Sequence, residues 1–149
     1  MPIASKVEVT EVGPRDGLQA EPRFVATDSK IKLINNLIDA GVPRIEFSSF
    51  VSPRAVPQLA DVADVFEGII RSGKTVLAAL VPNAKGAVRA ADAGVDEIVV
   101  FLSASESHNK KNVNRTVPEA LEVLGYDAAS IESIVAYIDQ NETIEGAEE

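Results

Sequence analysis

The chain has 149 residues, and its composition limits the kinds of site it can carry. It contains no cysteine, which excludes disulfides, thiolate metal sites and thiol nucleophiles. Its single histidine argues against a multi-histidine metal site or a Ser-His-Asp triad with a spare base. The net charge of −9, from 14 Lys and Arg against 23 Asp and Glu, argues against nucleic acid or an anionic membrane as a partner.

The negative charge lies at one end of the sequence. Residues 1–115 carry equal numbers of acidic and basic side chains, whereas residues 116–149 contain no Lys or Arg. This asymmetry predicts two segments, 1–115 and an appended acidic tail over 116–149. No apolar stretch reaches the roughly 18 residues of a membrane span. The first residues also lack the apolar run of a signal peptide, so we expect a cytoplasmic protein with no membrane partner.

The first half of the chain alternates between strand-like and helix-like patterns. Residues 6–12 (KVEVTEV) alternate apolar and polar side chains and predict a first strand. A helix is predicted over residues 27–41, with Thr27 as its N-cap. Residues 43–47 (PRIEF) predict a second strand, and apolar residues at helical spacing predict a second helix over 53–73.

Two further strands are predicted downstream. Residues 75–81 (TVLAALV) are almost entirely apolar, which is typical of a strand buried on both faces. Asn83 is predicted to cap a helix over 84–93, and residues 96–102 predict a fourth strand. The remaining predicted elements are a polar loop over 103–115 and helices over 118–124 and 128–140.

Four consecutive strand-loop-helix units predict an α/β fold with a parallel sheet and helical crossovers. Two architectures satisfy this pattern, an open doubly wound sheet and part of a (β/α)8 barrel. A complete barrel needs about 250 residues, and periodicity alone does not choose between the two.

Polar side chains follow the predicted strands at their carboxyl ends, where parallel α/β proteins bind their ligands. A carboxylate such as Asp16 can hold Mg²⁺ or Mn²⁺, and the adjacent Arg15 could stabilise a negatively charged oxygen that develops there. Glu46 could orient Arg15 or take part in proton transfer. The alternative is structural, with Asp16 in an Asp-Gly turn and Arg15 paired with an exposed acid. The polar residues at these positions include Arg15, Asp16, Gln19, Glu46, Ser49 and Asn83.

The string EVGPRDGLQ at 11–19 resembles the N-terminal signature of the hydroxymethylglutaryl-CoA lyases, which are metal-dependent (β/α)8 barrels. The resemblance covers about residues 5–115. Related acyl-CoA condensing enzymes carry a similar Arg-Asp-Gly-x-Gln core, but the Gly-Pro that precedes it here favours the lyases. The other matching strings are IEFSSFVSPRAVPQLAD at 45–61, VPNAKG at 81–86 and FLSASESHNKKNVNR at 101–115.

The resemblance implies the barrel architecture and a carbon–carbon lyase. Such an enzyme cleaves 3-hydroxy-3-methylglutaryl-CoA, or a similar 3-hydroxyacyl-CoA, with Mg²⁺ or Mn²⁺, so an acyl-CoA is the expected substrate. It implies that Asp16 is a metal ligand, that Arg15 stabilises the enolate of the departing acetyl thioester, and that Glu46 lies beside them. The residues it implies on the substrate side are Gln19, Ser49 and Asn83.

The sequence also departs from this family. The family's His-x-His pair, a further Asn ligand and a Cys on a glycine-rich loop are absent, and only four β/α units precede the tail. We therefore expect a half barrel that is poorly active or inactive alone and needs self-association or a second half-barrel partner. The alternatives are a binding module that requires a partner, a fragment of a related condensing enzyme, and a small doubly wound ligand-binding domain.

Residues 116–124 could begin the helix that follows in the lyases, but the rest of the acidic tail does not resemble them. Residues 125–149 are weakly similar to a helical segment of adenosylcobalamin-dependent ribonucleotide reductases, a similarity that implies no function here. Apolar residues at helical spacing predict an amphipathic helix in this tail. The surface that this helix would cover is left open, and the sheet edge is one candidate.

Overall fold

The computed structural model describes residues 6–71 and 73–141. The chain forms two compact units that divide after Val100. The sequence predicted a different boundary, after residue 115, from charge and resemblance. The boundary after residue 115 describes where the resemblance to the family ends, whereas the division after Val100 describes how the chain packs. The boundary after residue 115 therefore stays a prediction.

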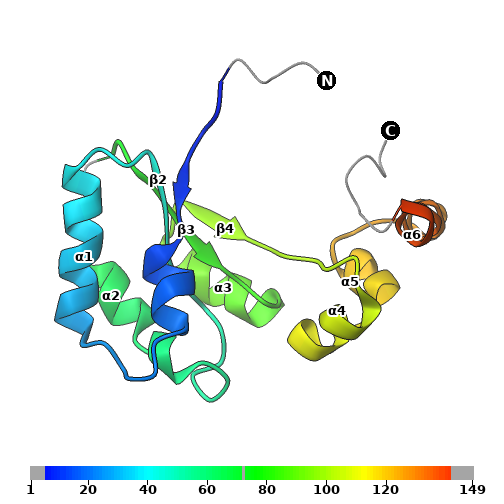
Figure 1. Ribbon diagram of the computed structural model, residues 1–149, viewed down its shortest axis with the longest axis horizontal. Coiled ribbons are helices and arrows are strands. Elements are labelled where there is room, and N and C mark those ends of the chain that lie inside the picture. Colours follow the sequence, from blue (N-terminus) through cyan, green and yellow to red (C-terminus); the bar gives the residue numbers. More distant parts are fainter. Residues whose placement is uncertain (1–5, 72, 142–149) are drawn as a thin grey trace. The chain divides into compact units, whose positions relative to one another are not determined.

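The first unit contains four parallel strands that follow one another in the sheet in their chain order (Figure 1). A doubly wound sheet reverses its strand order at a switch point, whereas a (β/α)8 barrel keeps it. The prediction of four parallel β/α units of the barrel type is therefore confirmed. The strands are β1 (Thr10–Glu11), β2 (Arg44–Ser49), β3 (Val76–Leu80) and β4 (Glu97–Val99).

Helices connect the strands and cover one face of the sheet. α1 and α2 pack against each other and against β2 (Figure 1). α3 begins at the predicted cap, because the Asn83 Oδ1 accepts a hydrogen bond from the Gly86 N–H (3.0 Å), and it ends before Gly94, which has a φ of 77°. The helical elements are η1 (Gly13–Gly17), α1 (Thr27–Asp39), η2 (Pro57–Leu59), α2 (Val62–Gly68) and α3 (Ala84–Ala93).

Two predicted strands were too long. The first strand covers only Thr10–Glu11, not 6–12, because β1 pairs with β2 only at Arg44 and Ile45. β4 covers three residues rather than 96–102. Both strands lie at an edge of the described sheet, where one side of the strand has no neighbour to extend the pairing.

The helix predicted over 53–73 was wrong as one element. The structure has two shorter elements there, η2 and α2. Pro57, which has no N–H to donate inside a helix, is the first residue of η2, so no helix runs through it from residue 53. The prediction of Thr27 as a cap was also wrong. Ala26 holds that position, and the Thr27 hydroxyl instead donates a hydrogen bond to Asp61 Oδ2 (2.7 Å).

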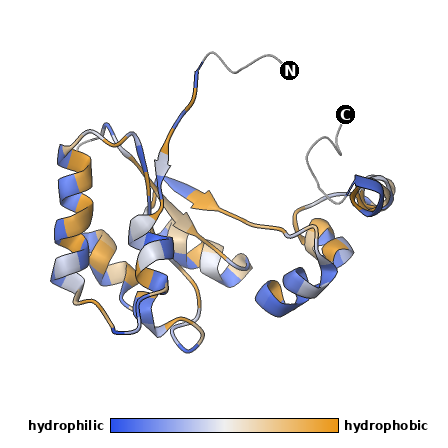
Figure 2. Ribbon diagram, in the orientation of Figure 1, coloured by the Kyte–Doolittle hydropathy of each residue, from blue (hydrophilic) through white to orange (hydrophobic). Residues whose placement is uncertain are grey.

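The core lies between the sheet and its covering helices. Ile34 of α1 and Ile45 of β2 have no exposed surface, and the rings of Phe47 and Phe66 lie 5.0 Å apart. Figure 2 shows the apolar stripe of α1 beside its polar residues. The pattern of burial confirms that β3 is largely buried, since Leu77, Ala78 and Ala79 are at most 1% exposed.

A buried ion pair joins α1 to the segment before α2. Lys30 is 3% exposed, and its Nζ lies 2.6 Å from Asp61 Oδ1 and 2.5 Å from the Gln58 carbonyl oxygen. The ammonium also lies 4.1 Å from the centre of the Phe24 ring. Lys30 lies on the same face of α1 as Ile34 and Ile38. Because this face is buried, the Lys30 ammonium is buried with it.

The second unit is helical. It contains α4 (Glu106–Val113), α5 (Val117–Val123) and α6 (Ala128–Asn141), with a small apolar core centred on Leu121 and Ile134. The helices predicted at 118–124 and 128–140 are confirmed. The loop predicted over 103–115 was wrong at its centre, because Ser105 caps α4 and allows a polar helix there. None of the helices within the described ranges is long and apolar enough to cross a lipid bilayer.

We expect the Lys30→Met substitution to destabilise the first unit by about 3–5 kcal/mol, because it leaves the Asp61 carboxylate buried without its cation. Urea denaturation followed by circular dichroism measures the change. The matched control is Lys32→Met, which removes an exposed lysine from the same helix and should leave the free energy of unfolding nearly unchanged. Equal losses in the two variants would contradict this assignment.

The start of α5 and the start of α6 should lose stability in acid. A hydrogen bond from the Thr116 backbone N–H lowers the pKa of Glu119, and one from the Ser130 N–H lowers the pKa of Asp127. A carboxyl group whose pKa is lower in the folded state stabilises it above the unfolded-state pKa and loses that effect as the pH falls through the folded-state pKa. Helicity measured by circular dichroism should therefore fall below about pH 4. The Glu119→Gln/Asp127→Asn double variant should show a smaller fall, and an equal fall would contradict the assignment.

Candidate functional site

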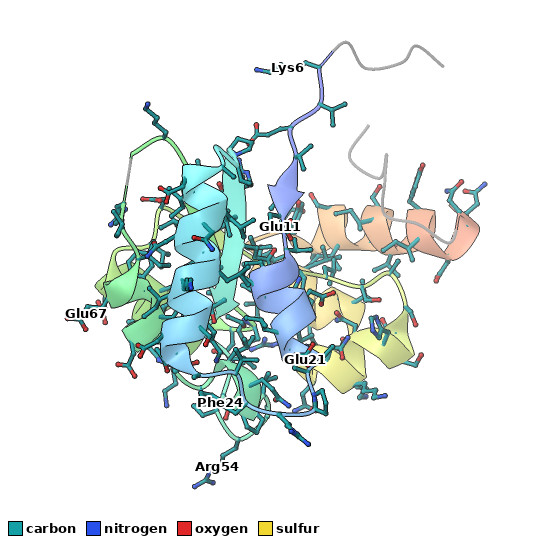
Figure 3. All side chains as sticks on the ribbon, turned by 60° about the vertical axis from the view of Figure 1, so that its left-hand side comes forward. Lys6, Glu11, Glu21, Phe24, Arg54 and Glu67 are labelled. Carbon is teal, nitrogen blue, oxygen red and sulfur yellow. The ribbon has the colours of Figure 1, made fainter. Side chains whose placement is uncertain are left out.

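The segment after β1 forms a tight helical turn that fixes Arg15 and Asp16. Residues Gly13–Gly17 form the π-helical turn η1, where the sequence predicted a loop. The N–H groups of Arg15 and Asp16 both donate to the Val12 carbonyl oxygen, at 3.0 and 2.7 Å. The Gly13 N–H donates to Glu11 Oε1 (2.6 Å), and Figure 3 shows Glu11 where β1 leads into this turn. π-Turns are rare and frequent at functional sites.

The Arg15 guanidinium lies between two carboxylates. Its Nε donates to Glu46 Oε1 on β2, and its Nη1 donates to Asp16 Oδ1 (2.8 Å). Glu46 is only 7% exposed, so Arg15 compensates a carboxylate that is largely removed from water. Within the described ranges, no hydrogen-bond acceptor contacts Nη2. The planar group is therefore held in one orientation with a further donor available.

A bulge in β2 determines which side chains share the face of Glu46. Glu46 pairs with Ala78, but Ser48 and Ser49 pair with Ala79 and Leu80, so one residue of β2 is extra. Side chains of paired residues point to the same face of a sheet. Ser49 therefore lies on the face of Glu46, opposite the apolar core, where strict alternation would have placed Ser48.

Glu46 was predicted at the end of the second strand but lies within it, because β2 continues to Ser49. The other predicted site residues differ in their surroundings. Ser49 has no exposed surface, and its hydroxyl donates to the Leu80 carbonyl oxygen (3.1 Å). Asn83 is exposed and uses its amide oxygen to cap α3. Gln19 is exposed on the helical residues that follow η1. The structure thus brings Arg15, Asp16 and Glu46 into contact, while Ser49 and Asn83 have local structural hydrogen bonds.

The described residues do not form a complete site for a divalent metal ion. Asp16 has a 64% exposed side chain and offers one carboxylate, which it shares with Arg15. Among the residues that the structure describes, no three His, Asp or Glu side chains are grouped to hold an ion. His108 Nδ1 lies 3.1 Å from Ser103 Oγ, and its Nε2 lies 2.8 Å from Asn112 Nδ2. Mg²⁺ takes about six oxygen ligands, so Asp16 alone is insufficient.

A hydrogen-bonded link that the sequence did not predict joins the segments that follow β1 and β2. The Gln58 Nε2 donates to the Glu21 carbonyl oxygen (3.1 Å), and Lys30 holds the Gln58 carbonyl oxygen. Figure 3 shows Glu21 and Phe24 on the segment between η1 and α1. The spacing of Lys30 from Ile34 and Ile38 could have revealed this lysine, since it continues the apolar face of the helix.

The sheet order and the Arg15 site define the first unit as a parallel β/α domain of the barrel type, with its polar residues at the carboxyl ends of the strands. A family model described as HMGL-like matches residues 6–142. The chain therefore belongs to the HMGL-like family. The matched range includes most of the acidic segment 116–149.

Known proteins resemble the chain over much of its length. It is 49% identical to a hydroxymethylglutaryl-CoA lyase of Bacillus subtilis over 83% of the chain and 42% of the relative, and the crystal structure of the B. subtilis lyase has a TM-score of 0.78. It is 45% identical to a 3-hydroxy-3-isohexenylglutaryl-CoA/hydroxymethylglutaryl-CoA lyase of Pseudomonas aeruginosa, over 82% of the chain and 41% of the relative. A lyase from Acinetobacter baumannii, solved with coenzyme A and 3-methylmalate, is 43% identical with a TM-score of 0.75, over 90% of this chain and 42% of that one.

These relatives are lyases, and the family generally depends on a divalent metal ion. The chain spans about two fifths of the length of the curated relatives named above. The similarity confirms the resemblance on which the barrel architecture and the lyase class were predicted. It leaves the individual roles of Arg15, Asp16 and Glu46 as predictions.

We expect Asn83→Ala to destabilise the first unit by about 1 kcal/mol, because the Gly86 N–H loses its capping oxygen. Asn83→Asp keeps an oxygen at that position and should retain the stability. Thermal denaturation compares the two variants. If both destabilise equally, the cap is not the main role of Asn83, and the predicted contact of its amide with substrate gains support.

Proposed function

We propose that this chain supplies the enolate-stabilising half of a hydroxymethylglutaryl-CoA lyase site. The observation that carries the proposal is the Arg15 guanidinium, which is held by the buried Glu46 of β2 and whose Nη2 makes no hydrogen bond to the described residues. Guanidinium groups fixed in this way stabilise an oxygen that becomes negative during a reaction, because no reorganisation is needed at that moment. The names of the relatives support an acyl-CoA as the substrate.

The proposed reaction places a negative charge on an oxygen that a fixed guanidinium can stabilise. Cleavage of 3-hydroxy-3-methylglutaryl-CoA removes the proton of the C3 hydroxyl, forms a C3 carbonyl and breaks the bond between C2 and C3. The electron pair of that bond moves into the thioester as an enolate, which takes a proton at C2 to give acetyl-CoA beside acetoacetate. Arg15 donates to the enolate oxygen, and Glu46 orients the guanidinium rather than transferring the proton, because one of its oxygens already accepts from Nε.

Asp16 has a separate part in this proposal. Its exposed carboxylate could supply one oxygen ligand to a Mg²⁺ or Mn²⁺ ion, and such an ion would polarise the substrate oxygens. The remaining ligands would have to come from outside the described residues. Gln19 is exposed and can contact the acyl chain. Ser49 acts on the substrate side only through the backbone that its hydroxyl holds, because the side chain is fully buried.

We expect the chain alone to show no lyase turnover, since the described residues do not complete a metal site. Turnover should appear when it is combined with the unmatched remainder of the B. subtilis relative and Mg²⁺ or Mn²⁺. Arg15→Gln should then lower kcat by about 10²–10³-fold, because the enolate loses a charged donor. Acetyl-CoA release from 3-hydroxy-3-methylglutaryl-CoA is the measurement.

The matched control is Arg71→Gln, which removes a half-exposed guanidinium that pairs with Asp96. Arg71 precedes β3 in the chain and therefore lies away from the carboxyl ends of the strands. It should leave kcat within about twofold, since it lies outside the proposed site. Full turnover by the Arg15→Gln variant, with the same circular dichroism spectrum, would overturn the proposal.

A further inference from the structure

The helical second unit has a groove between α5 and α6 that its own core leaves open. The two helices pack against each other through the apolar core centred on Leu121 and Ile134. Beside this contact lies a groove of about 800 Å³. The larger apolar residues that line it are only half-buried, so the three helices of the unit do not cover them. These residues are Pro118, Tyr126, Ile131 and Val135.

The part of α6 that lines the groove is a continuous face of the helix. The core residues Ile134 and Ile138 point to a different face of the same helix. The groove face extends from residue 128 to residue 139, a length of about 17 Å, which corresponds to about three turns of a second helix laid alongside. Its residues recur at intervals of three and four positions, as Ala128, Ile131, Glu132, Val135, Ala136 and Asp139.

All charged residues that line the groove are acidic, namely Glu119, Glu122, Asp127, Glu132 and Asp139. The carboxylates of Glu119 and Asp127 accept hydrogen bonds from backbone N–H groups at the starts of α5 and α6. Glu122, Glu132 and Asp139 make no ion pair or hydrogen bond with any residue that the structure describes. Residues 116–149 contain no Lys or Arg that could neutralise them. The groove therefore combines an apolar surface with negative charge that is not compensated.

This combination excludes several occupants. The last eight residues of the chain, 142–149, contain four glutamates and no cation, so they do not complement the groove. A second copy that presented the same groove would place like charges opposite each other, which destabilises an interface. Nucleic acids and anionic lipids are repelled for the same reason. A segment with both apolar and cationic side chains satisfies the apolar surface and the charge together.

We propose that the groove between α5 and α6 binds an amphipathic helix of a partner protein, whose apolar stripe is flanked by Lys or Arg. The apolar stripe packs on Ile131 and Val135. The cations lie beside the unpaired carboxylates of Glu122, Glu132 and Asp139. Helices that dock in this way are recognised by side chains spaced three and four positions apart, and opposite charges accelerate the encounter and fix its orientation. The proposal concerns the second unit alone and does not rest on the proposed lyase function.

A synthetic peptide tests the proposal on the full chain. The probe is a helix of about 15 residues made of Leu, Ala and Lys, with Leu along one face and Lys on both sides of it. Fluorescence anisotropy should show saturable one-to-one binding, with a Kd that rises as salt is added. A second peptide with Glu in place of each Lys should not bind. Absence of binding by the lysine peptide, or equal binding of the two peptides, would overturn the proposal.

The Glu122→Gln/Glu132→Gln double variant separates the groove from the net charge of the chain. It should raise the Kd of the lysine peptide by about 10-fold or more, because two unpaired carboxylates are lost. The matched control is Asp64→Asn/Glu67→Gln, which removes two exposed carboxylates from α2 and changes the net charge equally. It should change Kd by less than about twofold. Equal losses in the two double variants would show attraction by net charge alone and would contradict the proposal.

A lysine placed in the groove gives a second comparison. Ala136 is exposed on the groove face of α6, so Ala136→Lys should raise Kd by about 10-fold or more through bulk and like charge. Ser133→Lys adds the same charge at an exposed position of α6 that does not line the groove, and it should raise Kd by less than about threefold. Circular dichroism verifies that each variant is folded. If light scattering shows the unmodified chain as a dimer that Ala136→Lys dissociates, the occupant is a second copy and the proposal is wrong.

Discussion

The ion pair between Arg15 and Glu46 is the interaction on which the site depends. A carboxylate that is 7% exposed within a strand is costly to ionise unless a cation contacts it, and Arg15 is that cation. The arginine can reach it only because η1 turns the chain directly after β1 and because β1 lies next to β2. Fold stability and the orientation of the guanidinium thus have the same origin.

The bulge in β2 and the buried Lys30 extend this dependence to the neighbouring segments. The bulge places Ser49 on the face of Glu46, and its hydroxyl fixes the carbonyl of Leu80 at the end of β3. Lys30 holds the chain that follows β2 through Gln58 and Asp61. The first three strand ends are therefore connected by hydrogen bonds of buried or half-buried groups, which fixes the backbone around Arg15 without a ligand.

The sequence was sufficient to predict the elements whose signals are local. Asn83 and Gly94 mark both ends of α3, and the alternation of strands and helices predicts the parallel sheet. Features that depend on distant residues were not predicted. The Thr27 hydroxyl donates to Asp61 and does not cap α1, and the ends of β1 and β4 depend on which strands pair with them. The contact of Arg15 with Glu46 was foreseen only as one of two possible roles of Glu46, because a sequence separation of 31 residues carries no signal of distance.

The strength of the charges around Arg15 depends on how far water reaches them. Its side chain is 18% exposed and that of Asp16 is 64% exposed, so water screens the pair formed by these two residues. Glu46 is 7% exposed, so water screens its pair with Arg15 less than the pair with Asp16. The orientation of the guanidinium is therefore set mainly by Glu46, and Asp16 is the carboxylate that stays open to a ligand.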